Sequence, residues 1–120
     1  MKTKTSPTST SEPPLPKSIK IGWVTYAIEE WSVPGSVGAD RYGECSHTEN
    51  IIRVAFCYGT QQAASTLLHE IMHAIYALWN IKDQDEEERT VKTMAHGLST
   101  VWLDNPAVLD WIGWHIQHGT

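Results

Sequence analysis

The 120-residue sequence predicts a small α+β domain, in which a mostly antiparallel sheet packs on a central helix that two more helices follow. Three observations support this fold class. Short runs of β-forming residues, separated by turn residues, occupy the segment 19–56. A long apolar run with helical periodicity covers 61–79, and two further helical segments come after it. A chain of this length forms one hydrophobic core, to which its six tryptophans contribute.

The beginning of the chain differs in composition from the rest. Residues 1–16 are rich in Thr, Ser, Pro and Lys and show no apolar period. Such a segment buries too little apolar surface to offset the entropy cost of ordering it. We therefore expect residues 1–16 to form a disordered arm, with a docking peptide as the alternative, and residues 17–120 to form the folded domain.

The strands are expected in the first half of the domain. Residues 19–28 are rich in Ile, Val, Trp and Tyr, and the apolar alternation shifts at Gly22, which predicts one strand with a bulge. Two more strands are expected over 42–46 and 51–56. The polar sequence His-Thr-Glu-Asn at 47–50 separates them, so we expect these two strands to form a hairpin.

The longest helix is expected over residues 61–79. Its apolar residues follow the i, i+3, i+4, i+7 spacing of a core-facing stripe, namely Ala64, Leu67, Leu68, Ile71, Ile75 and Leu78. The other face carries polar or aromatic residues with few charges, namely Gln62, Thr66, His69, His73 and Tyr76. We therefore expect this helix to be buried on most sides, with its polar face lining a cleft.

Two helices complete the domain. A second helix is expected over 86–103, with one face that we expect to point inward and that carries Glu88, Val91, Ala95, Leu98 and Trp102. Because Pro106 cannot continue a helix, Asn105 is expected to cap a third helix over 106–117. The histidines near the end of the chain, His115 and His118, are expected in a solvated tail.

The longest predicted helix contains the pattern His-Glu-x-x-His at 69–73. Residues i and i+4 lie one turn apart on the same face of a helix. Two imidazoles at this spacing can bind one zinc ion, and a carboxylate beside them can accept a proton from the attacking water. We therefore expect His69 and His73 to be zinc ligands and Glu70 to be the catalytic base. The alternative is a pair of core histidines held by hydrogen bonds.

A catalytic zinc ion usually takes three protein ligands and one water molecule. Residues 81–91 contain no histidine, so the chain offers carboxylates at the start of the second predicted helix instead. Glu88 lies on the face that we expect to point inward, where a carboxylate needs a partner. Glu87 is its neighbour and remains an alternative third ligand. Cys45, on the predicted hairpin, is another.

Three motifs are shared with a known family. They are His-Glu-Ile-Met-His-Ala-Ile at 69–75, Glu-x-x-Val-x-x-Met-Ala at 88–95, and Gly-Leu-Ser-Thr-Val-Trp-Leu-Asp-Asn-Pro at 97–106. In these motifs the chain resembles small gluzincin-type metallopeptidases of the ImmA/IrrE kind and short His-Glu-x-x-His proteins of bacteriophages and prophages. The resemblance implies Glu88 as the third zinc ligand and cleavage of a protein substrate in a phage or prophage setting. The chain departs from the pattern at Val91, where many of these proteins have Ala.

Composition narrows the choice of partners and compartment. Nine basic residues against fourteen acidic ones give a net charge of -5, so we expect no nucleic-acid partner. No apolar run approaches the roughly 18 residues of a membrane span, and no secretory signal precedes the domain. We therefore expect a cytoplasmic protein, in a bacterial host cell if a phage encodes it, with Cys45 and Cys57 as free thiols.

Together these observations predict a zinc-dependent metallopeptidase whose protein or peptide substrate lies along an exposed strand, for which 51–56 is the candidate edge. Two alternatives remain. The first is a non-catalytic phage accessory protein in which a fourth protein ligand closes a structural zinc site. The second is a deformylase-like amidase, because Gly-Glu-Cys-Ser at 43–46 faintly resembles the segment that carries the cysteine ligand of peptide deformylases.

Overall fold

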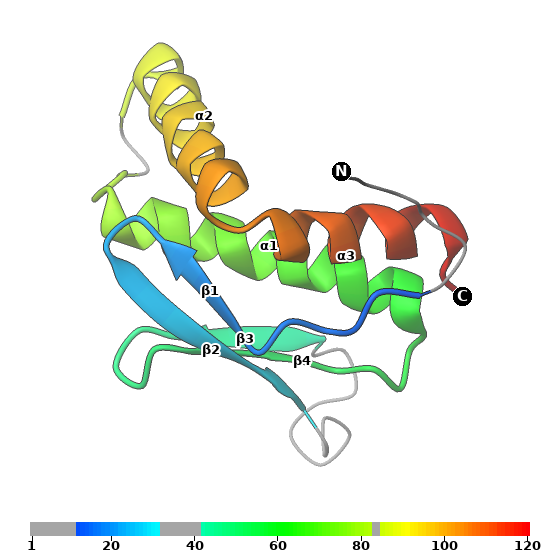
Figure 1. Ribbon diagram of the computed structural model, residues 1–120. Coiled ribbons are helices and arrows are strands. Elements are labelled where there is room, and N and C mark those ends of the chain that lie inside the picture. Colours follow the sequence, from blue (N-terminus) through cyan, green and yellow to red (C-terminus); the bar gives the residue numbers. More distant parts are fainter. Residues whose placement is uncertain (1–11, 32–41, 83–84) are drawn as a thin grey trace.

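Four strands followed by three helices make up the computed structural model, which describes residues 12–31, 42–82 and 85–120 (Figure 1). The strands are β1 (Ser18–Ile21), β2 (Val24–Glu30), β3 (Gly43–Ser46) and β4 (Ile51–Val54). The helices are α1 (Thr60–Leu78), α2 (Glu87–Asp104) and α3 (Pro106–His118). The α+β class is confirmed, and the expected ends of the helices lie within two residues of the observed ones.

The first predicted strand is a hairpin. Instead of one bulged strand, β1 and β2 pair in antiparallel fashion, with Ile21 opposite Val24. Gly22 has a φ of 60°, which is the backbone conformation that a two-residue hairpin loop with glycine in first position requires. The prediction of a bulge is therefore wrong, because the shift in apolar phase at Gly22 comes from a reversal of the chain.

The sheet is mixed, with strand order β1-β2-β4-β3. The pairs β1–β2 and β3–β4 are antiparallel, whereas β2 and β4 run parallel and pair over residues 27–30 and 51–54. The 47–50 hairpin is confirmed. The expectation that 51–56 forms an edge is wrong, because β4 lies between β2 and β3, and the two edges of the sheet are β1 and β3. An apolar run does not reveal which of its neighbours it pairs with.

Helix α1 lies between the sheet and the other two helices (Figure 1). The predicted apolar stripe of α1 is largely buried, with Leu67, Ile71 and Ile75 at zero exposure. The core is completed from the sheet by Ile19, Ile21, Tyr26, Ile28, Ile52 and Val54, and from α2 and α3 by Val101, Val108, Trp111 and Ile112. The helix ends where Asn80 takes a φ of 56°, and the N–H groups of Asn80 and Ile81 then bond the last carbonyls.

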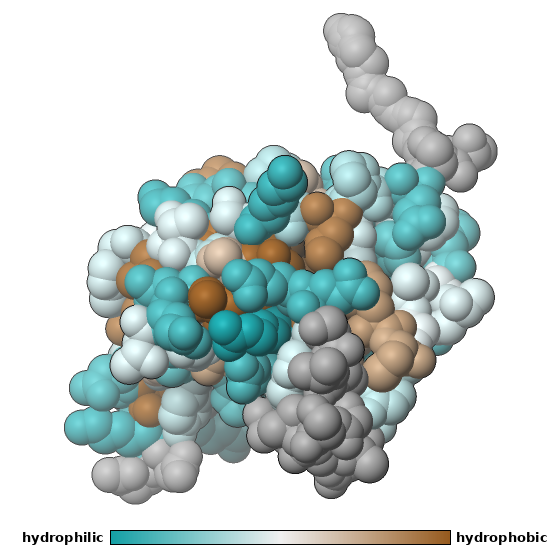
Figure 2. All heavy atoms as spheres, turned by 90° about the horizontal axis from the view of Figure 1, so that it is seen from below, coloured by the Kyte–Doolittle hydropathy of each residue, from teal (hydrophilic) through white to brown (hydrophobic). Residues whose placement is uncertain are grey.

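The sheet covers the core with one face only. Its other face is seen from below in Figure 2, where hydrophilic side chains predominate. At its centre the guanidinium of Arg53 donates to Glu44 Oε2 at 2.6 Å and also lies 3.5 Å from carboxylate oxygens of Glu29 and Glu49. The site described below forms on the opposite face of the sheet, which packs against α1.

Helix α2 uses a different face for packing than the sequence predicts. Val91 is 57% exposed and Trp102 is 62% exposed, so the expectation that the face with Glu88 points inward is wrong. The contact with α1 forms at Gly97, where an added Cβ would lie 2.5 Å from Ile75 Cγ2. The absence of a side chain at Gly97 lets the two helices approach closely, and this decides the rotation of α2.

The junction between α2 and α3 is tied to the sheet. Asn105 is the N-cap residue of α3, as predicted, but its side chain makes no capping hydrogen bond. Its Oδ1 accepts from the Lys20 N–H at 2.8 Å, and its Nδ2 donates to the Lys20 carbonyl at 2.6 Å. One amide side chain thereby pairs with the outer strand β1 as a neighbouring strand would.

The last residues of the predicted arm make defined contacts. Leu15 packs against the core, and next to the arm the carbonyl of Lys17, the first residue of the predicted domain, accepts from the Ile28 N–H. Glu12 lies 2.9 Å from the Nε2 of His115, which is 1% exposed and is therefore not part of a solvated tail. These contacts differ from the expectation for residues 12–16, while residues 1–11 lie outside the described residues. In the described part of the chain, no helix is long and apolar enough to cross a membrane.

Candidate metal centre

The two histidines of the motif lie on the polar side of α1, one turn apart, and both are exposed. Their Nε2 atoms are 3.0 Å apart and their rings are nearly perpendicular, at 79°. A tetrahedral ion with bonds of about 2.0–2.1 Å requires ligand nitrogens about 3.3 Å apart. The pair therefore fits a zinc ion after a shift of a few tenths of an ångström, which breaks only the hydrogen bond between the rings.

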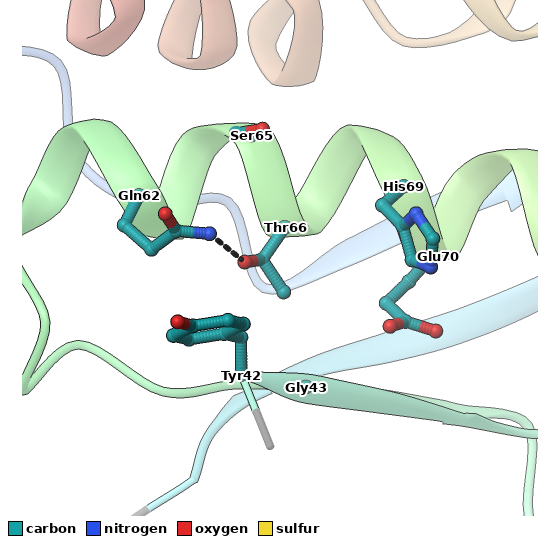
Figure 3. Close-up of a pocket in the computed structure, with 7 residues that line it drawn as sticks. All are labelled: Tyr42, Gly43, Gln62, Ser65, Thr66, His69 and Glu70. Atoms are coloured by element: carbon teal, nitrogen blue, oxygen red, sulfur yellow. Dashed lines mark hydrogen bonds between the residues drawn. The ribbon is translucent and has the colours of Figure 1, made fainter. Parts of the chain in front are cut away.

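Glu70 is placed differently from its neighbours. It is 7% exposed, and its carboxylate points from α1 toward β3, as Figure 3 shows. It lines the same cleft as His69 and His73. A carboxylate beside two possible zinc ligands is placed where it can accept a proton from a water molecule in the cleft.

Strand β3 approaches α1 closely because its first residue is glycine. An added Cβ on Gly43 would lie 2.6 Å from Thr66 Cγ2, 2.7 Å from the Arg53 carbonyl oxygen and 3.6 Å from Glu70 Oε2. Any side chain at this position would push the strand away from the helix. Gly43 therefore sets the distance between the outer strand and the Glu70 carboxylate.

A cavity of about 300 Å³ opens between α1 and the start of β3. Figure 3 shows its lining, which consists of Tyr42, Gly43, Gln62, Ser65, Thr66, His69 and Glu70. The Gln62 Nε2 donates to Thr66 Oγ1 at 3.2 Å. Below them lies the ring of Tyr42, which contacts Tyr58 edge to face at a centroid distance of 4.8 Å.

Cys45 and His47, from β3 and its turn, share a cleft with the motif. The residues of this cleft are Gly43, Glu44, Cys45, His47, His69, Glu70 and His73. Burial raises the pKa of Cys45 to about 11, and the negative charge of Glu70 is the second cause. His47 Nδ1 lies 3.1 Å from the Tyr26 hydroxyl and 4.0 Å from Cys45 Sγ. Both cysteines are free thiols, as predicted.

The structure does not bring Glu88 to the histidine pair. Glu88 is exposed and lies in the first turn of α2, the end of that helix that points away from α1 and the sheet (Figure 1). Glu87 occupies the same turn and is exposed as well. Within the described ranges, no group of three or more His, Cys, Asp or Glu side chains lies close enough to hold a metal ion. Glu88 as third ligand remains a prediction that this position of α2 does not support.

Comparisons with known protein families, with curated proteins and with solved structures found no match. The gluzincin resemblance thus rests on the motifs of this sequence alone.

Gln62 and Thr66 line the cavity, as expected for the polar face of this helix. Three residues of the site escaped the sequence analysis. Gly43 looks like an ordinary strand residue, and Tyr42 looks like the start of the same strand. Ser65 lies four residues before His69, which is one turn along the same helix face, and this spacing is the one signal in the sequence that could have indicated it.

Proposed function

We propose that this protein is a zinc-dependent metallopeptidase with His69 and His73 as zinc ligands and Glu70 as catalytic base. One observation carries the proposal: two imidazole nitrogens 3.0 Å apart share a cleft with a carboxylate that is 7% exposed. Histidines whose only role was to pack in the hydrophobic core would be buried, whereas His69 and His73 are exposed at the cleft.

The division of labour follows from the chemistry of the groups. Zinc held by His69 and His73 would polarise the scissile carbonyl and lower the pKa of water toward about 7. Glu70 accepts a proton from the attacking water and passes it to the leaving amine, so that peptide and water become a carboxylic acid and an amine.

In this proposal the substrate binds along the free edge of β3. The other edge of this strand is hydrogen-bonded to β4. An extended peptide that paired with this free edge as an additional strand would pass close to Glu70, because Gly43 holds β3 close to that carboxylate. The substrate is then a protein or peptide segment without regular structure.

A deformylase-like amidase is the second candidate, and a specific observation favours it. Cys45 lines the cleft with both histidines, and Glu88 does not. Burial raises the pKa of the Cys45 thiol to about 11, and a zinc ion at the histidine pair would favour its thiolate instead. Both candidates use Glu70 in the same way and differ in the third ligand.

The decisive experiment is the substitution Glu70→Gln in the zinc-loaded full chain. The variant keeps the shape of the side chain and removes the proton acceptor, so we expect unchanged zinc content with turnover about 10²–10⁴-fold lower. Substrates are first found by mass spectrometry of new peptide termini in a bacterial proteome. Zinc content is measured by elemental analysis.

Two results would contradict the proposal. One is a wild-type protein that binds no zinc. The other is a zinc-bound structure in which a fourth protein ligand occupies the place of water and Glu70 turns away, which would favour the structural-zinc alternative.

A further inference from the structure

We propose that the cavity beside Glu70 selects a substrate residue with an uncharged, hydrogen-bonding side chain, and that a carboxamide, as in Gln or Asn, fits it best. This inference rests on the proposed peptidase function and names its substrate preference. It is carried by Gln62, Ser65 and Thr66, three polar residues of α1 that line the cavity without taking part in the proposed chemistry.

The cavity lies where a substrate side chain would enter. Gln62, Thr66 and Glu70 follow one another along α1, and Figure 3 shows Thr66 and Glu70 directed to the same side, toward β3. Residues of an extended peptide advance by about 3.3 Å, and their side chains alternate between the two faces. A peptide on β3 with its scissile bond at Glu70 therefore places one nearby side chain over the cavity.

The lining offers both donors and acceptors. Gln62 Nε2 donates to Thr66 Oγ1, which holds the amide of Gln62 in one orientation. In the described part of the chain, Gln62 Oε1 accepts no hydrogen bond, and the Ser65 hydroxyl has no partner. A carboxamide can donate its N–H to Gln62 Oε1 and accept from a hydroxyl, so it satisfies both kinds of group.

Other side chains fit this cavity less well. A carboxylate would lie beside the nearly buried charge of Glu70. A large apolar side chain would remove water from Gln62 and Ser65 without replacing their hydrogen bonds. A cationic side chain would approach the metal at the histidine pair, and the described lining offers it no carboxylate apart from Glu70.

The test uses labelled octapeptides in which one position at a time carries Gln, Leu, Glu or Lys. Binding to the zinc-loaded Glu70→Gln full chain is measured by fluorescence anisotropy, and cleavage by the zinc-loaded wild type is measured by mass spectrometry. At one position we expect Gln to bind about tenfold more tightly than Leu, as one to two hydrogen bonds predict. At the same position the wild type, which keeps the Glu70 charge, should cleave the Gln peptide in preference to the Glu peptide.

Variants of Gln62 assign this preference to the cavity. In the Glu70→Gln background, Gln62→Leu should abolish the advantage of Gln, and Gln62→Glu should shift the preference to Lys by about tenfold or more. The matched control is Gln61→Leu, since Gln61 is the neighbouring glutamine and its amide donates to the Ile116 carbonyl instead of lining the cavity. This control should keep the preference for Gln. Circular dichroism confirms that each variant is folded.

The outcomes separate the two proposals. Binding without any side-chain preference, a preference that survives both Gln62 substitutions, or no peptide binding at all would overturn the selectivity of the cavity. If the wild type cleaves peptides but shows no side-chain preference, or a preference that survives both Gln62 substitutions, the peptidase proposal still holds. Selective binding without cleavage by the wild type would overturn the peptidase proposal and leave the cavity as a peptide-binding site.

Discussion

At the scale of single residues, the site depends on which face of α1 each side chain occupies. His69 and His73 share the exposed side of the helix, and Glu70 points into the space between α1 and β3. Their spacing along the chain is enough to bring the two Nε2 atoms within 3.0 Å. A third ligand has no such local constraint, because it must come from another element.

The third ligand is decided by comparing zinc affinity among three variants. Cys45 lines the cleft and Glu88 does not, so we expect Cys45→Ser to lower zinc affinity by at least about tenfold. Glu88→Gln should leave the affinity unchanged, and Glu87→Gln is its matched control in the same turn. Competition with a chromogenic chelator measures the affinities. If zinc is lost in Glu88→Gln and kept in Cys45→Ser, the gluzincin assignment is correct and the first turn of α2 must reach the histidines.

At the scale of elements, two glycines determine how closely α2 and β3 pack against α1. Gly43 brings β3 to Thr66, and Gly97 brings α2 to Ile75. As a result α2 packs through Gly97 and Val101, while Val91 and Trp102 stay exposed. The apolar face of α2 that carries Val91 and Trp102 is therefore not the buried one, because the face with Gly97 permits closer packing against α1.

Two glycine-to-alanine substitutions test this explanation. In Gly97→Ala the new Cβ would lie 2.5 Å from Ile75 Cγ2, in a side chain with zero exposure, so we expect a loss of about 1–3 kcal/mol in unfolding free energy. Gly113→Ala is the matched control within α3, because its Cβ meets nothing within 4 Å. It should gain about 0.5–1 kcal/mol from helix propensity. Urea titration measures both, and equal effects would contradict the packing role of Gly97.

At the scale of the whole molecule, the segment before β1 contacts both the hydrophobic core and the last helix, α3. Leu15 packs on the core, and Glu12 lies against His115 of α3. His115 Nδ1 is 3.0 Å from the Trp111 carbonyl oxygen, so both ring nitrogens face oxygen atoms. The contact with Glu12 ties this segment to the last helix.

Truncation at two points measures what this segment contributes. Deletion of residues 1–16 removes Leu15 and Glu12 and leaves His115 without its carboxylate, so we expect unfolding free energy to fall by about 2 kcal/mol. Deletion of residues 1–11 retains these contacts and should change stability by less than about 0.5 kcal/mol. Urea titration at neutral pH compares the two proteins. Equal stabilities would show that the contacts of residues 12–16 contribute nothing.

Much of the fold could be predicted because its signals are local. The histidine spacing, the apolar stripe of α1, the hairpin at 47–50 and the stop at Pro106 each depend on residues within a few positions of one another. Backbone hydrogen bonding and side-chain periodicity act over that range. The sequence by itself therefore determined the α+β class, the position of α1 and the pairing of His69 with His73.

Only the tertiary structure decided which distant groups meet at the site. Strand β3 lies at an edge of the sheet because β4 pairs with β2 on its other side, and Cys45 shares a cleft with the histidines because Gly43 lets β3 approach α1. Glu88 stays away because α2 packs through Gly97. These outcomes follow from the closest packing that several elements can reach together, and small residues set that limit. A pattern read along one segment contains no information about the shape of its neighbour, so it could not have predicted them.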